Sequence, residues 1–319
     1  MKIDVVSSES HYQSHLLPIF EALPDHLRGN VLPMAPPGEA TRPPMGRIAM
    51  VAGWQDVNPL RGQCPMIYVE HGAGQVYVDA LHDPSYSGSG GRRHSGVIGF
   101  IAPSETVAER WTSAPSVAVG CPKMDKWLNA PMPEKPSICF AWHWNGSTAP
   151  EARSAYLHYG PQLHEIINLY KSMGFRVFGH EHPKWRGAMN RMWEDYDVEI
   201  LYTDEEVFAQ ASILMVDNSS LAYEFALIGR PVVSLNAPWY RRDVEHGLRF
   251  WEYVPGIQVE GPERLLSLNP WDLLHDTRLA GVCKEGGRLA ADYAYAKPPA
   301  GMTSSQCAAQ WITDLVGEV

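Results

Sequence analysis

Short apolar runs alternate with polar turns and helical stretches along the chain. In the first half, apolar and β-branched runs predict buried strands at residues 3–7, 47–52, 65–69 and 96–103. Apolar residues at helical spacing follow the first of these strands. Ser10 is placed to cap that helix, and Pro18 is placed to kink it or delay its start. Strands that alternate with helices are typical of βα units on a parallel sheet.

The same alternation resumes after a proline-rich stretch. Residues 129–136 hold three prolines and show no hydrophobic period, so they are the best candidate for an interdomain linker. Beyond them, strands are predicted at residues 137–142, 176–178, 198–202, 213–216 and 232–235, and helices at residues 161–173, 221–228 and 304–316. The chain therefore divides into two α/β halves, residues 1–132 and 137–319.

Composition narrows the class of protein. A length of 319 residues favours about two domains. Lys and Arg number 26 against 36 Asp and Glu, and the net charge of −10 disfavours general binding to nucleic acid. No apolar run approaches the roughly 18 residues of a membrane span. The five cysteines are scattered and form no CxxC, which favours reduced thiols in the cytoplasm over disulfides or a cysteine-based zinc site.

The most informative local pattern is the junction at residues 217–224. An apolar strand runs directly into Asp217, Asn218, Ser219 and Ser220, and a helix that contains Glu224 begins there. Backbone N–H groups and two hydroxyls at such a junction can bind an anion, above all a diphosphate, at the carboxyl end of a parallel strand. Simple N-capping of the helix by Ser219 or Ser220 explains the pattern equally well.

Two histidine segments also follow predicted strands. His71 stands beside Gly72 after residues 65–69, where an accessible imidazole can act as a general base, although a turn histidine that binds only backbone is the more common case. His180 and His182 can share one wall of a site. No third and fourth ligand stand at a spacing typical of zinc, so no metal is expected.

Arginines in two loops are weaker candidates. Arg92 and Arg93 lie in a Gly/Ser-rich stretch that is either a surface loop or an active-site lid that meets a phosphate. Arg241 follows Trp239 and Tyr240 in a loop beside the serine junction; it can bind a phosphate, or the loop can be ordinary amphipathic surface. The Trp142-His143-Trp144 cluster is interpreted as packing.

Taken in order, these segments resemble a GT-B glycosyltransferase and, more narrowly, CDP-glycerol glycerophosphotransferase-like proteins. UDP-N-acetylglucosamine 2-epimerases are more distant relatives. The matching stretches are the first helix with His15 and Pro18, the His71-Gly72 pair, residues 119–125, the His182-Pro183 pair, and residues 217–231. The resemblance implies an α/β fold of two Rossmann-like domains whose parallel sheets face each other across a cleft. The last helix would pack back on the N-terminal domain.

The resemblance also implies roles for the residues that match. His71 would be the catalytic base, and His182 would contact the donor phosphate. Ser219 and Ser220, with Asn218, would bind the donor diphosphate, supported by Asp217, Glu224 and Arg241. The reaction would move a glycosyl or glycerophosphoryl group from a nucleotide-diphosphate donor to an acceptor hydroxyl, with no cofactor and no metal.

The expected partners are a nucleotide-activated donor, a hydroxyl acceptor (a glycan, a polyol phosphate or a modified DNA base) and, as one option, a second copy of the chain in a homodimer. No integral membrane contact is expected. Three other functions stay open: a DNA-base glycosyltransferase, a UDP-sugar 2-epimerase and a non-catalytic nucleotide-binding module. The base of the donor and the identity of the acceptor are not fixed by the sequence.

Overall fold

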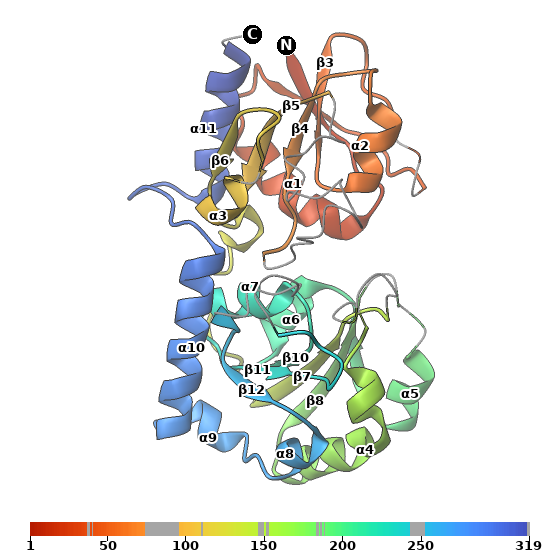
Figure 1. The fold of residues 1–319 in the computed structure, drawn as a ribbon, viewed down its shortest axis with the longest axis vertical. Helices are drawn as coiled ribbons and strands as arrows, with labels where there is room; N and C mark the ends of the chain where they lie inside the picture. The colour runs from red at the N-terminus through yellow and green to blue at the C-terminus, as the bar shows by residue number, and fades with distance from the viewer. Residues whose placement is uncertain are drawn as a thin grey trace. The chain divides into compact units, whose positions relative to one another are not determined.

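The structure, a computed structural model, describes residues 1–36, 39, 41–73, 96–109, 111–145, 150, 153–182, 185, 187, 189–242 and 253–317. It separates into two compact units. The first comprises residues 1–125 and 294–319, and the second comprises residues 126–293. The long helix α10 (Arg278–Ala294) leads from the second unit back into the first (Figure 1).

The first unit is built on a parallel sheet that has six strands within the described residues, in the order β2-β1-β3-β4-β5-β6. Its strands are β1 (Lys2–Val5), β2 (Arg28–Val31), β3 (Arg47–Val51), β4 (Met66–Val69), β5 (Val97–Ala102) and β6 (Ser116–Ala118). Its helical segments are α1 (Ser10–Ala22), α2 (Trp54–Leu60), α3 (Glu105–Ala108), η2 (Pro122–Met124) and α11 (Ser304–Gly317).

The first helix differs from the sequence expectation in two respects. Glu9 is its N-cap residue and Ser10 is already helical, so the prediction that Ser10 caps the helix was wrong. Pro18 lies inside α1, which continues to Ala22. A proline removes one helical hydrogen bond. The burial of Leu16 and Ile19 against the sheet outweighs that loss.

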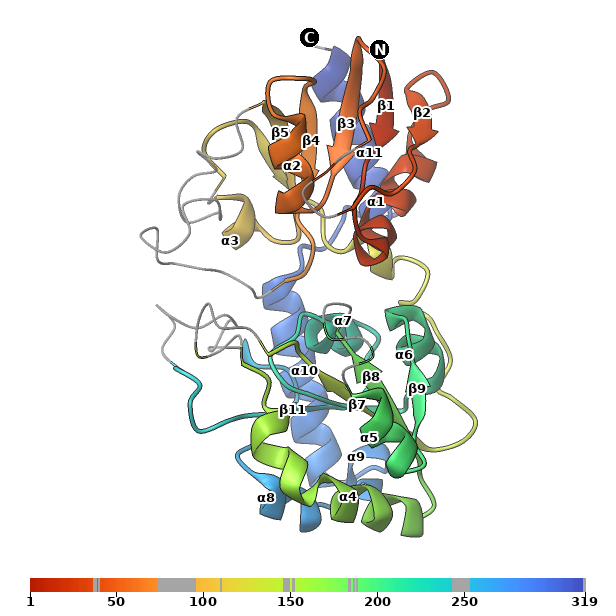
Figure 2. The ribbon, with the colours of Figure 1, turned by 90° about the vertical axis from the view of Figure 1, so that its right-hand side faces the viewer.

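The C-terminal helix α11 packs in the first unit. Ala308, Ala309 and Ile312 join the same buried cluster as the strands β1 and β3. The carboxylate of Asp125 accepts hydrogen bonds from the backbone N–H groups of Ser304 (3.0 Å) and Ser305 (2.8 Å) and thereby caps the helix. Figures 1 and 2 both show α11 beside the sheet formed by the N-terminal strands.

The second unit repeats the architecture. Its parallel sheet has six strands in the described part of the chain, in the order β12-β11-β10-β7-β8-β9. The strands are β7 (Ser137–Trp142), β8 (Arg176–Glu181), β9 (Glu199–Leu201), β10 (Ile213–Val216), β11 (Val232–Leu235) and β12 (Ile257–Val259). Besides α10, the helices are α4 (Tyr156–Ser172), α5 (Asn190–Asp195), α6 (Asp204–Gln210), α7 (Leu221–Leu227), α8 (Pro262–Leu266) and α9 (Trp271–Leu274).

Both sheets are doubly wound α/β sheets, so the prediction of two Rossmann-like parallel sheets is confirmed. The strands β7, β8 and β10 are buried along almost their whole length, as expected for a parallel sheet covered on both faces. None of the helices in the described ranges combines the length and the apolar character that crossing a bilayer requires.

Candidate functional site

Three neighbouring strands of the second sheet end in polar residues. β10 is followed by Asp217, β7 by His143 and β8 by His182. The strands pair in parallel, with Val216 opposite Ala141 and Trp142 opposite Glu181. Their carboxyl ends therefore meet at one edge, which is where ligands bind in open α/β sheets. Figure 2 shows β7 and β8 side by side in this unit.

Asp217 organises the backbone at this edge. The residue is fully buried, and one carboxylate oxygen accepts the backbone N–H of His143 at 2.7 Å. The other oxygen accepts the Ser154 hydroxyl and the Ala155 N–H, both at 2.9 Å. Asp217 thus ties the segment after β7 and the start of α4 to the end of β10. The carboxylate also caps the positive end of α4.

The serine pair lies half-buried at the start of α7. Ser219 Oγ accepts the backbone N–H of Leu221 at 3.3 Å, so this serine caps the turn as the simpler interpretation allows. Ser220 is the N-cap residue, and its side chain makes no capping hydrogen bond. Asn218 and Glu224 are buried beside them. The four residues gather at one strand–helix junction, as the sequence predicted.

His143 is the residue at this edge that sequence reasoning assigned only to packing. Its ring lies 5.0 Å from that of His182, at an interplanar angle of 62°. Nδ1 of His143 lies 3.0 Å from the carbonyl oxygen of Trp144. A carbonyl oxygen only accepts hydrogen bonds, so Nδ1 carries the ring proton. The signal that the sequence offered for His143 was its position directly after the predicted buried strand at residues 137–142.

Of the three predicted arginines, Arg241 lies within the described residues. Arg241 is exposed in the segment that follows β11. Its neighbour Arg242 forms an ion pair with Glu260. Arg92 and Arg93, and Pro183 after His182, lie outside the described residues.

In the first unit, His71 follows β4 at the carboxyl edge of the sheet. Its Nδ1 lies 2.5 Å from the carbonyl oxygen of Ala52, the residue after β3. The carbonyl fixes the proton on Nδ1, so Nε2 holds the basic lone pair of the neutral ring. Gly72 adopts a φ of +82°, which a residue with a side chain rarely does, so glycine is suited to this position directly after the imidazole.

Aromatic rings from α1 surround His71. The ring of Tyr12 lies 4.5 Å from it, and the rings of His11 and His15 lie 6.2 and 6.4 Å away. Burial, together with the carboxylates of Asp56 and Glu9, raises the pKa of Tyr12 well above its ordinary value. Tyr12 therefore remains protonated at neutral pH and acts as a hydrogen-bond donor or acceptor, not as a base.

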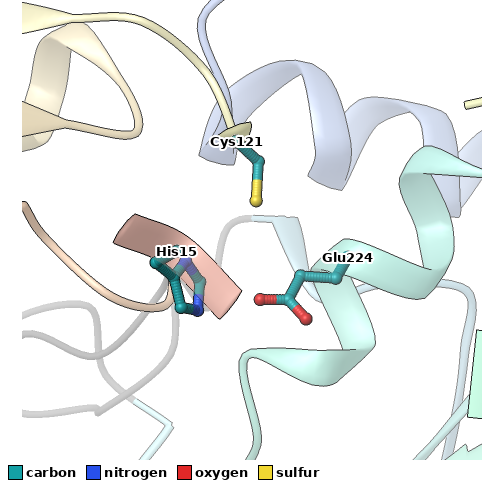
Figure 3. A group of neighbouring side chains, drawn as sticks. All are labelled: His15, Cys121 and Glu224. Atoms are coloured by element: carbon teal, nitrogen blue, oxygen red, sulfur yellow. The ribbon is translucent and has the colours of Figure 1, made fainter. Parts of the chain in front are cut away.

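Figure 3 draws His15, Cys121 and Glu224. His15 and Cys121 belong to the first unit, where a ring nitrogen and the thiol sulfur lie within 4.8 Å of each other. Glu224 belongs to α7 of the second unit. A histidine and a thiol supply two ligands, fewer than a structural or catalytic zinc site uses.

Two parallel Rossmann-like sheets of this kind define the GT-B fold. No protein-family model matches the chain, and no curated protein gives a significant match. Several solved structures are similar to the chain in fold. The chain is similar to the wall teichoic acid polymerase TagF, at 16% identity over 99% of this chain and 88% of that one, with a TM-score of 0.60.

Two further solved structures extend the likeness. A putative UDP-N-acetylglucosamine 2-epimerase from Listeria monocytogenes is 12% identical, covering 99% of this chain and 95% of that one with a TM-score of 0.55. MnaA from S. aureus, in a structure with UDP, is 14% identical over 99% and 96% of the two chains, with a TM-score of 0.52. At these identities the likeness is one of fold.

Proposed function

We propose that the protein is a metal-independent transferase that moves a glycosyl or glycerophosphoryl group from a nucleotide-diphosphate donor to an acceptor hydroxyl. The observation that carries this proposal is the gathering of His143, His182 and the Ser219-Ser220 pair at the carboxyl edge of the second sheet. Two imidazoles, two hydroxyls and the backbone N–H groups of a strand–helix junction are suited to a diphosphate.

The two units would divide the work. In the second unit, the serine hydroxyls and the histidine pair would hold the donor phosphates and stabilise negative charge on the leaving nucleotide. In the first unit, Nε2 of His71 would take the proton of the acceptor hydroxyl. The acceptor oxygen would bond to the transferred carbon or phosphorus as the bond to the leaving nucleotide breaks.

Solved structures of similar fold support a nucleotide donor. One TagF structure was obtained after a soak with CDPG, and the MnaA structure is a co-structure with UDP. The free state of all five cysteines supports a reducing, cytoplasmic location. The base of the nucleotide is left to experiment.

Calorimetric titration with CDP, UDP, GDP and ADP, each without metal, tests the donor site. We expect one nucleotide to bind, and the Ser219→Ala/Ser220→Ala double variant to lose that binding. Ser267→Ala, which removes an exposed hydroxyl at the end of α8, is the matched control. Failure of all four nucleotides to bind would refute the proposal, and binding without turnover would favour a nucleotide-binding module.

The 2-epimerase is a second candidate, favoured by the TM-score of 0.55 to a putative enzyme of that name. The two functions differ in their need for an acceptor. An epimerase converts its UDP-sugar with no acceptor present, whereas a transferase releases nucleotide in proportion to acceptor. Incubation with UDP-N-acetylglucosamine alone, followed by NMR of the sugar, separates them.

A further inference from the structure

Tyr12, in the first turn of α1, packs against the proposed base. It is almost fully buried (5% exposed), and its ring lies 4.5 Å from that of His71 at an interplanar angle of 63°, an edge-to-face contact. The rings of His11 and His15 lie farther from His71, at 6.2 and 6.4 Å. Aromatic pairs are favourable at such separations and angles. Tyr12 is thus the nearest to His71 of these three rings of α1.

The same ring packs on the backbone of Gly53. A Cβ atom added at Gly53 would lie 2.3 Å from Cε2 of Tyr12 and 2.9 Å from its Cδ2 and Cζ, well inside van der Waals contact. Gly53 has a φ of −108° and a ψ of 135°, extended backbone that any residue adopts, so its conformation does not require glycine. It is also the N-cap residue of α2, where serine, threonine or aspartate would stabilise the helix start. The Tyr12 ring therefore explains why this position has no side chain.

Gly53 follows the carbonyl group that holds His71. The oxygen 2.5 Å from Nδ1 of His71 belongs to the peptide bond that joins Ala52 to Gly53. Tyr12 therefore packs against both sides of this hydrogen bond: the imidazole that donates it and the residue next to the carbonyl that accepts it. One hydrogen bond leaves an imidazole free to turn about the line between donor and acceptor. A ring packed against the imidazole removes that freedom.

We propose that Tyr12 is a positioning residue for His71: its ring, seated on Gly53, fixes the orientation of the imidazole. Nδ1 then stays on the Ala52 carbonyl, and the lone pair of Nε2 stays fixed for the acceptor hydroxyl. The inference rests on the proposed function, in which His71 is the base. Tyr12 transfers no proton itself, because its raised pKa keeps the hydroxyl protonated. Its contribution is the ring, which a phenylalanine also has.

The tautomer of His71 in the full chain tests the proposal without any substrate. Long-range ¹H–¹⁵N NMR spectra at about pH 9, where imidazole is neutral, distinguish a proton on Nδ1 from one on Nε2. The signals that His71→Ala lacks identify this ring. We expect the wild type and Tyr12→Phe to hold the proton on Nδ1. Tyr12→Leu should lower the ratio of the Nδ1–H to the Nε2–H form about tenfold, because the aromatic contact is lost.

Gly53→Ala is the second variant. Its methyl group would displace the Tyr12 ring without removing a side chain from the core, so the tautomer ratio should fall to a similar extent. In a Tyr12→Leu background, which lacks Cε2 and Cζ, Gly53→Ala should lower the ratio little further, because the two changes act through one contact. Phe20→Leu is the matched control. It removes an aromatic ring of the same helix that packs against the same core, and should leave the ratio unchanged.

An unchanged ratio in Tyr12→Leu, or in Gly53→Ala where Tyr12→Leu does not fold, would overturn the proposal. So would an equal fall in Phe20→Leu, because loosening the core would then suffice, or in Tyr12→Phe, because the hydroxyl would then hold the ring. The nucleotide titration is independent of these spectra. A chain that binds a nucleotide but keeps the wild-type ratio in these variants refutes this inference alone. A chain that shows the expected ratios but binds no nucleotide refutes the proposed function alone.

Discussion

Nδ1 of His71 and the carbonyl oxygen of Ala52 are 2.5 Å apart and join the ends of two adjacent strands. The contact sets the tautomer of the imidazole and holds its ring, because an acceptor oxygen requires the proton on Nδ1. A fixed Nε2 lone pair is the property that a general base needs.

His71→Ala should therefore lower kcat by about 10²- to 10⁴-fold, the usual contribution of general-base catalysis. Nucleotide affinity should stay unchanged, because the donor phosphates are assigned to the second unit. His26→Ala, which removes an exposed histidine of the same unit, should retain full activity. Turnover by His71→Ala at the unaltered rate would remove the base assignment.

The three hydrogen bonds of Asp217 predict a large effect on stability. Asp217→Ala removes the acceptor of the His143 and Ala155 N–H groups and of the Ser154 hydroxyl, so buried donors lose their partner. We expect a loss of about 3 kcal/mol in the free energy of unfolding in urea. Asp276→Ala, at an exposed site, should change it little. Equal stability of the two variants would contradict this assignment.

The raised pKa of Asp56 predicts how the stability of the protein depends on pH. Its pKa rises from 3.8 to about 6 on folding, so the native state holds a proton that the unfolded state releases. The associated stabilisation is complete below pH 4 and is lost as pH rises through 6. The difference in unfolding free energy between the wild type and Asp56→Asn should therefore shift in favour of the variant by up to about 3 kcal/mol between pH 4 and 8. A difference independent of pH would contradict this.

The capping of α11 by Asp125 predicts a local effect on stability and on hydrogen exchange. Asp125→Ala leaves the N–H groups of Ser304 and Ser305 without their carboxylate and should cost about 1–2 kcal/mol. Hydrogen exchange should accelerate in α11 and α1 and stay unchanged in α4. Asp314→Ala, on the exposed face of α11, is the matched control. Uniform acceleration in both units would argue against a local role.

Sequence periodicity predicted the buried strands better than the helix starts. Residues 137–142 and 213–216 are the strands β7 and β10 as predicted, because runs that are apolar on both faces fit only a covered parallel sheet. The helix predicted from residue 161 begins at Tyr156 instead. Pro161, the first residue of the predicted helix, lies inside α4.

The candidate site was predicted only in part, because local sequence shows which residues follow a strand but not which strands pair. Ser219 and His182 each stand directly after a strand, which a sequence shows. The closeness of His143 to His182 depends on the pairing of β7 with β8. The paired residues are 39 positions apart in the chain, from Ser137 opposite Arg176 to Trp142 opposite Glu181, and local sequence shows no sign of that pairing. The hydrogen bonds of Asp217 to residues 143, 154 and 155 likewise arise from sheet order and not from local pattern.

The place of α11 in the first unit has a consequence for synthesis on the ribosome. The second unit is one continuous stretch, residues 126–293, whereas the first needs residues 294–319 to complete its core. Domains generally fold as they emerge, the N-terminal one first. Here residues 1–125 lack part of their core, and expose the surface that Ala308 and Ile312 later cover, until α11 has been synthesised.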